Sequence, residues 1–322
     1  MRLRLVKRNT NFDFFSRWKL WLGISALMVM IGAASFLYQG LNFGIDFRGG
    51  TTIRTESPLP VVVSEYRDAI AVLELGDVTI TEVFDPQFRE DQNVAMIRIQ
   101  AQDGQESVTT EVVDAVEGAL KTVRPDIDFI SVESVGPKVS GELINTAIIA
   151  VVLAIGAVLI YIWLRFEWQF AAGAVLALIH DVVLTIGVFS ELQIRFDLAI
   201  IAALLTIVGY SLNDTVVVFD RVRENLRKYK NRPLKDLLNM SINETLSRTF
   251  MTSVTTLLAL IALFVLGGDV IRGFVFAMIW GVIVGTYSSI FVATAALLYF
   301  GVKRDWSKQD LNAGNQYANI DA

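Results

Sequence analysis

The stretch "LAIIAALLTIVGYSLNDTVVVFDR" at residues 198–221 places an aspartate, Asp214, inside a run of apolar residues. An apolar run of roughly 20 residues is long enough for a helix to cross the hydrocarbon core of a bilayer. Asp214 precedes Asp220 by six residues, so at ~1.5 Å per residue it lies roughly 9 Å inside the end of the helix. The stretch therefore predicts a transmembrane helix with an ionisable group inside the membrane.

The composition of the whole chain indicates the same class of protein. Of its 322 residues 53% are hydrophobic, and its mean hydropathy of +0.50 is too high for an average soluble domain. We therefore predict a polytopic α-helical membrane protein with six transmembrane helices. The apolar runs lie at about 20–38, 143–164, 169–190, 198–219, 250–266 and 274–300. The first follows a basic stretch, as in a signal peptide, but its length and flanking aromatic residues favour an uncleaved helix.

Several classes of chemistry are excluded by residue types that the sequence lacks. It has no cysteine and one histidine, His180, which excludes a disulfide framework, a thiolate site and a histidine-cluster metal centre. It also contains neither a GxxxxGK phosphate loop nor a GxSxG nucleophile motif. We expect no enzyme activity, no metal, no cofactor and no nucleic-acid partner.

The distribution of basic residues predicts the orientation in the membrane. Of the 28 lysines and arginines, 8 lie within 40–140 and 20 flank the apolar runs. With a cytoplasmic N-terminus, 18 of those 20 fall on the inner side, and only Arg195 and Arg272 fall outside. The positive-inside rule then places both termini in the cytoplasm. The predicted division is 1–17 (cytoplasmic), 18–39 (first helix), 40–140 (external domain), 141–300 (five further helices) and 301–322 (cytoplasmic tail).

Segment 40–140 differs from the rest of the chain in composition and pattern. It carries 18 acidic and 8 basic residues, a net charge of −10. Apolar residues alternate with period two in its short runs and repeat every four residues along one longer run. The pattern is strand-like at 51–57, 78–85, 93–100 and 128–135 and helix-like at 60–74 and 107–123. This βαββαβ order predicts a ferredoxin-like α+β domain.

Two further segments leave alternatives open. The basic cytoplasmic loop at 221–248 is predicted as a solvated or amphipathic helix broken at Pro233, either a retention signal or a docking site. In the last apolar run small residues recur every four positions, at Gly281, Gly285, Ser289 and Ala293. Such a stripe permits close contact with another helix, in this chain or in a partner.

Asp214 is the first candidate functional residue. An aspartate deep in a span costs ~2.5–3.5 kcal/mol on insertion scales, usually faces the bundle interior and marks an ion or proton path. A structural hydrogen-bonding role is the alternative. Arg248 begins the fifth apolar run, either as an interface anchor or turned inward to pair with Asp214. Burial disfavours the charged aspartate and a nearby arginine favours it, so the carboxyl would be able to gain and lose a proton.

Three more polar residues lie near these positions. Asn213 adjoins Asp214, and His180 and Asp181 lie near the middle of the third apolar run. Because adjacent helical residues point about 100° apart, His180 and Asp181 are expected to serve different neighbours. Asn213 and Asp181 are predicted as a supporting polar network, with a structural role as the alternative for Asp181, and His180 is predicted as a packing residue.

Seven stretches are distributed over most of 40–300. They are "NFGIDFRGGT" (42–51), "VGPKVSGEL" (135–143), "RFEW" (165–168), "HDVV" (180–183), "GYSLNDTVVVFDRVREN" (209–225), "TLSRTFMTS" (245–253) and "GGDVIRGFVFAMIWGVIVGTYSSIFVA" (267–293). In their types and order they resemble the SecF family, the smaller membrane subunits of bacterial SecDF complexes within the RND superfamily.

The resemblance implies half of a pseudo-symmetric bundle, completed by SecD, in a bacterial inner membrane. It implies assistance to preprotein export, with the SecYEG channel, YajC and in many cases YidC as further partners and an unfolded preprotein as client. It assigns proton coupling to Asp214 and Arg248. The proton-motive force would then change how the helices pack and move the external domain.

Two other functions fit parts of the sequence. An RND-type exporter half for a small amphiphile or lipid would share the buried aspartate, but it would need a larger external region with an apolar pocket. A scaffold without transport would use Asp214 and Arg248 only to hold helices together. Replacement of Asp214 by asparagine separates a scaffold from a coupling role, because it removes the charge and keeps the shape.

Overall fold

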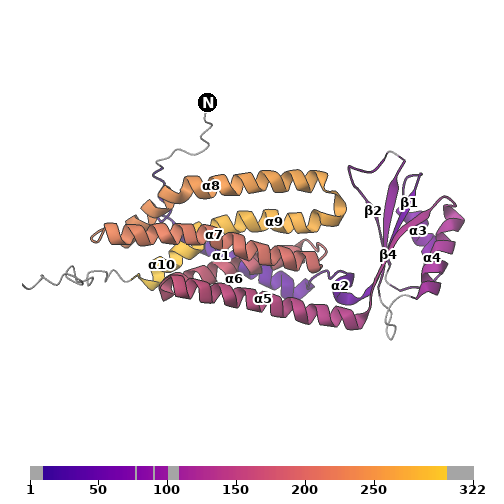
Figure 1. Ribbon diagram of the computed structural model, residues 1–322, viewed down its shortest axis with the longest axis horizontal. Coiled ribbons are helices and arrows are strands. Elements are labelled where there is room, and N and C mark those ends of the chain that lie inside the picture. Colours follow the sequence, from indigo (N-terminus) through magenta and orange to yellow (C-terminus); the bar gives the residue numbers. More distant parts are fainter. Residues whose placement is uncertain (1–9, 77, 90, 101–108, 303–322) are drawn as a thin grey trace, which may run out of the picture.

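The computed structural model describes residues 10–302 except 77, 90 and 101–108, and it consists of a bundle of long helices with a small α+β domain at one end (Figure 1). The elements are α1 (Trp18–Gln39), α2 (Ile45–Arg48), β1 (Gly50–Ser57), α3 (Val63–Ala71), β2 (Val78–Val83), β3 (Asn93–Gln100), α4 (Thr110–Val123), β4 (Asp128–Val135), α5 (Pro137–Arg165), α6 (Trp168–Glu191), α7 (Leu198–Lys228), α8 (Leu234–Leu266), α9 (Gly268–Ser288), η1 (Ser289–Ala293) and α10 (Thr294–Phe300). Six helical segments in the described part are long and apolar enough to span a membrane, which confirms the predicted architecture.

The α+β domain, predicted to be external, has the predicted ferredoxin-like arrangement. Its four strands form one antiparallel sheet in the order β2-β3-β1-β4. Period-two alternation buries one face of this sheet, where Ile53 lies opposite Ile97 and both pack against Leu120 of α4. Helices α3 and α4 cover that face, which is turned away from the bundle (Figure 1). The other face, with Arg54 and Arg98, is therefore turned toward the bundle.

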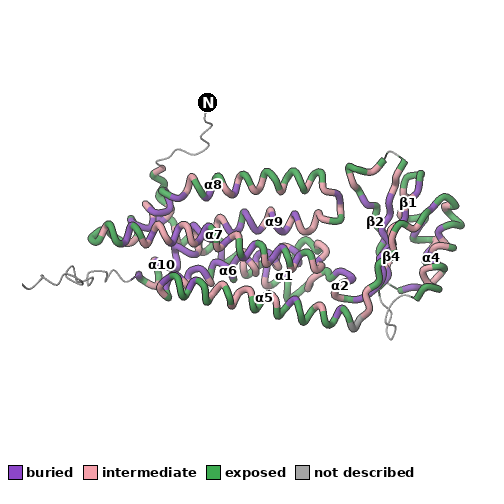
Figure 2. Tube along the Cα trace, in the orientation of Figure 1, coloured by how far each residue is buried: buried purple, intermediate pink, exposed green. Residues whose placement is uncertain are grey.

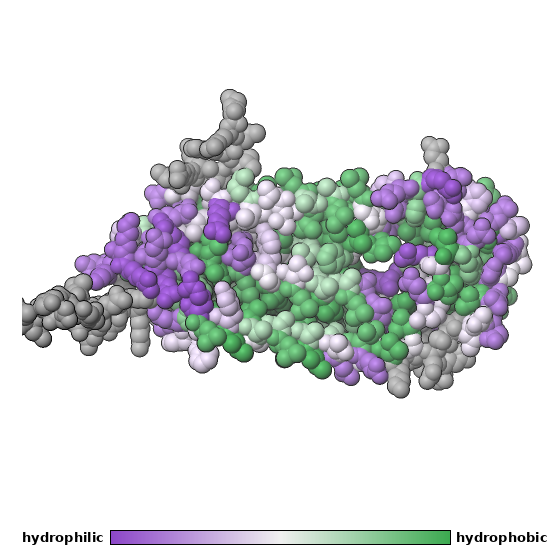
Figure 3. All heavy atoms as spheres, in the orientation of Figure 1, coloured by the Kyte–Doolittle hydropathy of each residue, from purple (hydrophilic) through white to green (hydrophobic). Residues whose placement is uncertain are grey.

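The interior of the bundle is formed by α6, α7 and α9. Their spanning segments are about half buried (56%, 44% and 56%), whereas those of α5 and α8 are only 11% buried. In Figure 2 much of α5 and α8 is coloured exposed or intermediate, and Figure 3 shows a wide apolar band over the bundle. An apolar surface of this extent needs lipid or another protein to cover it.

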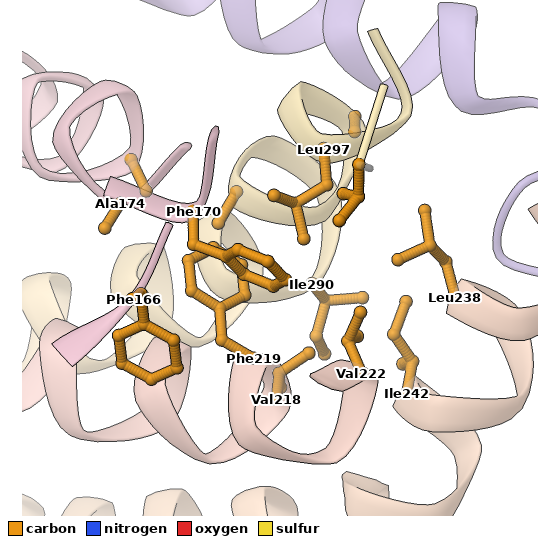
Figure 4. Close-up of a cluster of buried hydrophobic side chains, with 14 of the residues drawn as sticks. Phe166, Phe170, Ala174, Val218, Phe219, Val222, Leu238, Ile242, Ile290 and Leu297 are labelled. Carbon is orange, nitrogen blue, oxygen red and sulfur yellow. The ribbon is translucent and has the colours of Figure 1, made fainter. Parts of the chain in front are cut away.

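The segment 221–248 differs from the prediction in its extent. The break falls at Pro233 as predicted, but α7 continues to Lys228 and α8 begins at Leu234, so most of the segment is helical continuation rather than loop. The helices continue because their inner ends share an apolar core. There Val222, Leu238 and Ile242 meet a cluster that includes Phe170, Phe219 and Ile290 (Figure 4).

The stripe of small residues in the last span finds its partner in this chain. Gly281 and Gly285 of α9 face α7, and a Cβ added at Gly285 would lie 3.1 Å from the Cβ of Ser211. The continuation of the stripe, Ser289 and Ala293, lies in the π-helical turn η1 rather than in regular α-helix. Close contact between α7 and α9 therefore places their polar side chains within hydrogen-bonding range.

We predict that Gly173→Ala destabilises the protein, although alanine favours helix. A Cβ at Gly173 of α6 would lie 2.9 Å from the backbone oxygen of Ala293, so α6 and η1 would have to separate, at a cost of about 1–3 kcal/mol. At Gly156 of α5 nothing lies within 4 Å, and Gly156→Ala is expected to be neutral or stabilising by up to ~1 kcal/mol. Thermal unfolding in detergent measures both, and equal midpoints for the two variants would contradict this packing.

Candidate functional site

Asp181 is the centre of a buried polar cluster in the bundle. Its carboxylate, fully buried at 0% exposure, accepts hydrogen bonds at Oδ2 from Ser211 Oγ of α7 (2.6 Å) and from Ser288 Oγ of α9 (2.8 Å). Because Asp181 itself belongs to α6, one carboxylate connects three helices. These hydrogen bonds join α6, α7 and α9 through one side chain.

His180 is the third partner of this carboxylate. Its Nδ1 lies 2.9 Å from Asp181 Oδ1, and its ring stacks on Tyr287 with 6.1 Å between the ring centroids. The prediction that the two neighbours serve different partners was therefore incomplete. Each has its own partner on another helix, but the imidazole also turns toward the adjacent carboxylate. Its Nε2 is buried without a hydrogen-bond partner.

Asp214 is equally buried but differently surrounded. It is 2% exposed, and its Oδ2 has no hydrogen-bond partner. Arg248 of the neighbouring α8 is close enough to act on it electrostatically, but no ion pair within 4.0 Å joins Asp214 to any described residue, and Arg248 is exposed. The structure therefore brings the predicted pair to adjacent helices without direct contact. Asp214 is a buried carboxyl without fixed partners.

Hydroxyl groups extend the polar interior around Asp214. On its own helix Thr215 Oγ1 lies 2.8 Å from Ser289 Oγ of η1, and on the facing helices Ser253 Oγ lies 2.7 Å from Thr286 Oγ1. Thr249 Oγ1 of α8 is buried without a partner. These groups line the interior between α7, α8 and α9 with atoms that can donate or accept a proton. In the described residues, no group of three or more His, Cys, Asp or Glu side chains is arranged to hold a metal ion.

Asn213 does not belong to this cluster. It is exposed, and no hydrogen bond among the described residues joins it to Asp181. Its neighbour Asp214 faces inward, and adjacent side chains on a helix point in different directions, so Asn213 faces outward.

Ser288 was missed by sequence reasoning, because a serine in an apolar run is a weak signal. The stripe of small residues, which includes the adjacent Ser289, was the only hint.

The fold and the cluster define a multi-pass membrane protein with ionisable groups inside its bundle. Residues 115–303 match the family model described as protein export membrane protein SecD/SecF, C-terminal, and residues 35–57 match the SecD/SecF GG motif. The chain belongs to the SecD/SecF family.

Its relatives within that family are protein translocase subunits. The chain is 61% identical to the protein translocase subunit SecF of Cereibacter sphaeroides, over 100% of this chain and 99% of that one. It is 59% identical to the same subunit of Rhodobacter capsulatus, over 96% of this chain and 95% of that one.

Two solved structures of SecDF are similar to this chain. The crystal structure of SecDF from Thermus thermophilus matches with a TM-score of 0.81 and 34% identity over 93% of this chain. SecDF in a super-membrane-facing form matches with a TM-score of 0.69 and 36% identity over the same share. The chain spans 40% of either SecDF chain. The fold of this chain is therefore more similar to the first SecDF structure than to the super-membrane-facing form.

We predict that Asp181→Ala strongly destabilises the bundle. It leaves two serine hydroxyls and an imidazole without their acceptor, at about 1–3 kcal/mol for each unpaired group in a dry interior. Asp220→Ala is the control, since Asp220 forms only a half-exposed ion pair with Arg165 at 3.2 Å, worth about 0–1 kcal/mol. Unfolding midpoints in detergent compare them, and a control as damaging as Asp181→Ala would contradict the central role of this carboxylate.

Proposed function

We propose that the chain acts with a SecD-type partner subunit in protein export, and that protonation of Asp214 drives its conformational change. The proposal is carried by one observation: the carboxyl of Asp214 is buried and its Oδ2 has no hydrogen-bond partner. The similarity to SecF subunits over the full chain supports the export role. The match to only 40% of a SecDF chain supports a partner that supplies the rest of the bundle.

Asp214 suits a proton carrier better than Asp181 does. Ser211 and Ser288 donate hydrogen bonds to the carboxylate of Asp181, and His180 Nδ1 lies 2.9 Å from it, so this carboxylate is held in place by its neighbours. Asp214 lacks such donors, and the opposing influences on it are burial and the charge of Arg248. A proton on Asp214 cancels its attraction to Arg248. The packing of α7 against α8 then changes with the protonation state.

Hydrogen bonds connect these helices to the external domain. At the start of α9, directly after α8, the Asp269 backbone N–H donates to Phe84 O (3.0 Å), and Asp269 Oδ2 accepts from Phe84 N (2.8 Å). At the start of α7 the carboxylate of Asp46 accepts from Leu198 N (3.0 Å). A shift of α7 or α8 therefore reaches the domain directly. Movement of one charge through the membrane potential supplies ~2.3 kcal/mol per 100 mV, which is enough for a modest shift between two conformers.

The arrangement of the chain suits the predicted orientation. One end of the bundle, opposite the sheet, contains the basic segment 221–249, the start of α1 and the end of α10 (Figure 1). In the proposal this end is cytoplasmic and the sheet lies outside a bacterial inner membrane, where it would contact an emerging preprotein. Association with SecYEG, YajC and YidC remains a prediction of the resemblance.

We predict that Asp214→Asn ends gradient-dependent stimulation of export and leaves the protein folded. The amide keeps the size of the side chain and removes only the charge, and no hydrogen bond of Oδ2 is lost. Export of a preprotein into inverted membrane vesicles, with and without a proton gradient, measures the effect. Asp236→Asn removes an exposed carboxylate of α8 and is expected to export like the parent.

The export assay, together with co-purification of the partner subunit, separates the rival functions. Undiminished, gradient-dependent export by Asp214→Asn vesicles would sink the proton role. Loss of co-purification with the partner subunit, without a separate loss of coupling, would favour the scaffold.

We predict that Arg248→Gln impairs coupling more than Arg248→Lys does. Both substitutions shorten or replace an exposed side chain, but only glutamine removes the positive charge that acts on Asp214. The gradient-dependent part of export is expected to fall roughly tenfold or more, the equivalent of 1.4 kcal/mol, for glutamine and by less for lysine. Equal activity of Arg248→Gln and the parent would assign Arg248 to the lipid interface alone.

A further inference from the structure

Two adjoining pockets lie where the external domain meets the bundle. The larger has a volume of about 680 Å³ and the smaller of about 130 Å³, and both are lined by Ile45, Arg98 and Arg195. In Figure 3 the surface is hollowed between the apolar band of the bundle and the polar domain. Neither pocket contains a residue of the Asp181 cluster or Asp214.

The smaller pocket is lined by cations and neutral polar groups. Arg48 comes from α2, Arg98 from the open face of the sheet, and Arg195 from the turn between α6 and α7. Asn42, Thr79 and Gln100 add amide and hydroxyl groups, and its described lining includes no carboxylate. Three guanidinium groups from three separate segments thus converge on a space large enough for one small anion.

These guanidinium groups lack good partners inside the protein. Arg98 Nε and Arg195 Nε are buried without a hydrogen bond. Arg98 Nη2 donates only to the sulfur of Met96 (2.8 Å), a weak acceptor. The nearest carboxylate to Arg195 is that of Asp197, whose Oδ2 is 4.0 Å from Nε, and Asp46 is engaged in capping α7.

The electrostatics agree with this geometry. Burial first, and then the positive charges of Arg195 and Arg54, lower the pKa of Arg98 to about 10, although the carboxylate of Asp197 acts in the opposite direction. The carboxylate of Asp197 acts on Arg98 and also lies 4.0 Å from Arg195 Nε, so two cations share one anion. Guanidinium groups with free donors match the oxygen atoms of a phosphate particularly well.

We propose that Arg48, Arg98 and Arg195 bind a phosphate group, supplied by the headgroup of an anionic phospholipid. The pocket lies at the level where α1 ends at Gln39 and α7 begins at Leu198, which is the membrane surface on the side of the domain. In the adjoining larger pocket, the apolar contacts come from Phe264, Phe274 and Phe276 of α8 and α9. The same pocket is also lined by acidic residues: Asp46, Glu82, Glu133, Asp197 and Asp269. A lipid bound here contacts the sheet and the bundle together and holds the domain against the membrane.

Binding of two probes to the full chain in non-ionic detergent tests the site. Native mass spectrometry measures retention of a short-chain phosphatidylglycerol, and calorimetry measures binding of inorganic phosphate against chloride. Arg98→Gln and Arg195→Gln are each expected to weaken lipid retention roughly tenfold or more, the loss of one charge-assisted hydrogen bond. Arg67→Gln, which removes an exposed arginine of α3, is the matched control and is expected to bind like the parent.

Two further variants test the site in case Arg98→Gln or Arg195→Gln fails to fold. Arg48→Gln changes an exposed residue of the short helix α2, and Arg98→Lys keeps the charge without the forked donors. Arginine-dependent retention of the lipid supports the proposal, and competition by inorganic phosphate shows that the phosphate group itself is recognised. Binding of inorganic phosphate alone keeps the anion site and overturns the lipid as its source. Equal lipid retention by the parent, Arg67→Gln and the pocket variants overturns the site.

Discussion

The bundle depends on one constraint, which is that a polar group inside a membrane must find its partner inside the protein. Asp181 meets it with donors from two other helices and from its neighbour His180. This arrangement requires α7 and α9 to approach closely, and Gly281 and Gly285 permit that approach. The stripe of small residues and the buried carboxylate are therefore two parts of one packing solution.

Asp214 shows the opposite use of the same constraint. It lies on α7 three residues after Ser211, which donates a hydrogen bond to Asp181. The Oδ2 atom of Asp214 itself has no hydrogen-bond partner. One carboxylate fixes the helices, and the other keeps an energetic cost that protonation can relieve. In the proposed function, the helices fixed by Asp181 form the frame against which a change at Asp214 would act.

The sequence predicted the features that long apolar runs and a regular period of apolar residues determine. Six spans followed from run length, and the ferredoxin-like order followed from alternation in strands such as 93–100. Features that depend on tertiary contact were not predicted. The sequence predicted helix after Asp220 and a break at Pro233, but it did not predict that this helix continues α7 and packs on α8. The π-helical turn at 289–293 was not predicted either, because no residue type marks it. Asn213 was assigned to the network by adjacency alone, and helix geometry turned it outward.

Arg248 shows why the site is incomplete within one chain. It lies exposed on α8, a helix whose spanning segment is only 11% buried, so its environment is set by whatever covers that face. If the SecD-type half of the proposed assembly covers α8, Arg248 becomes desolvated and its attraction to Asp214 strengthens, because the Coulomb interaction rises as the effective dielectric falls. The interaction between the two charges would then depend on assembly. The coupling residues would lie at the seam between the two halves, and a chain without its partner would retain the fold but lose the response to a proton.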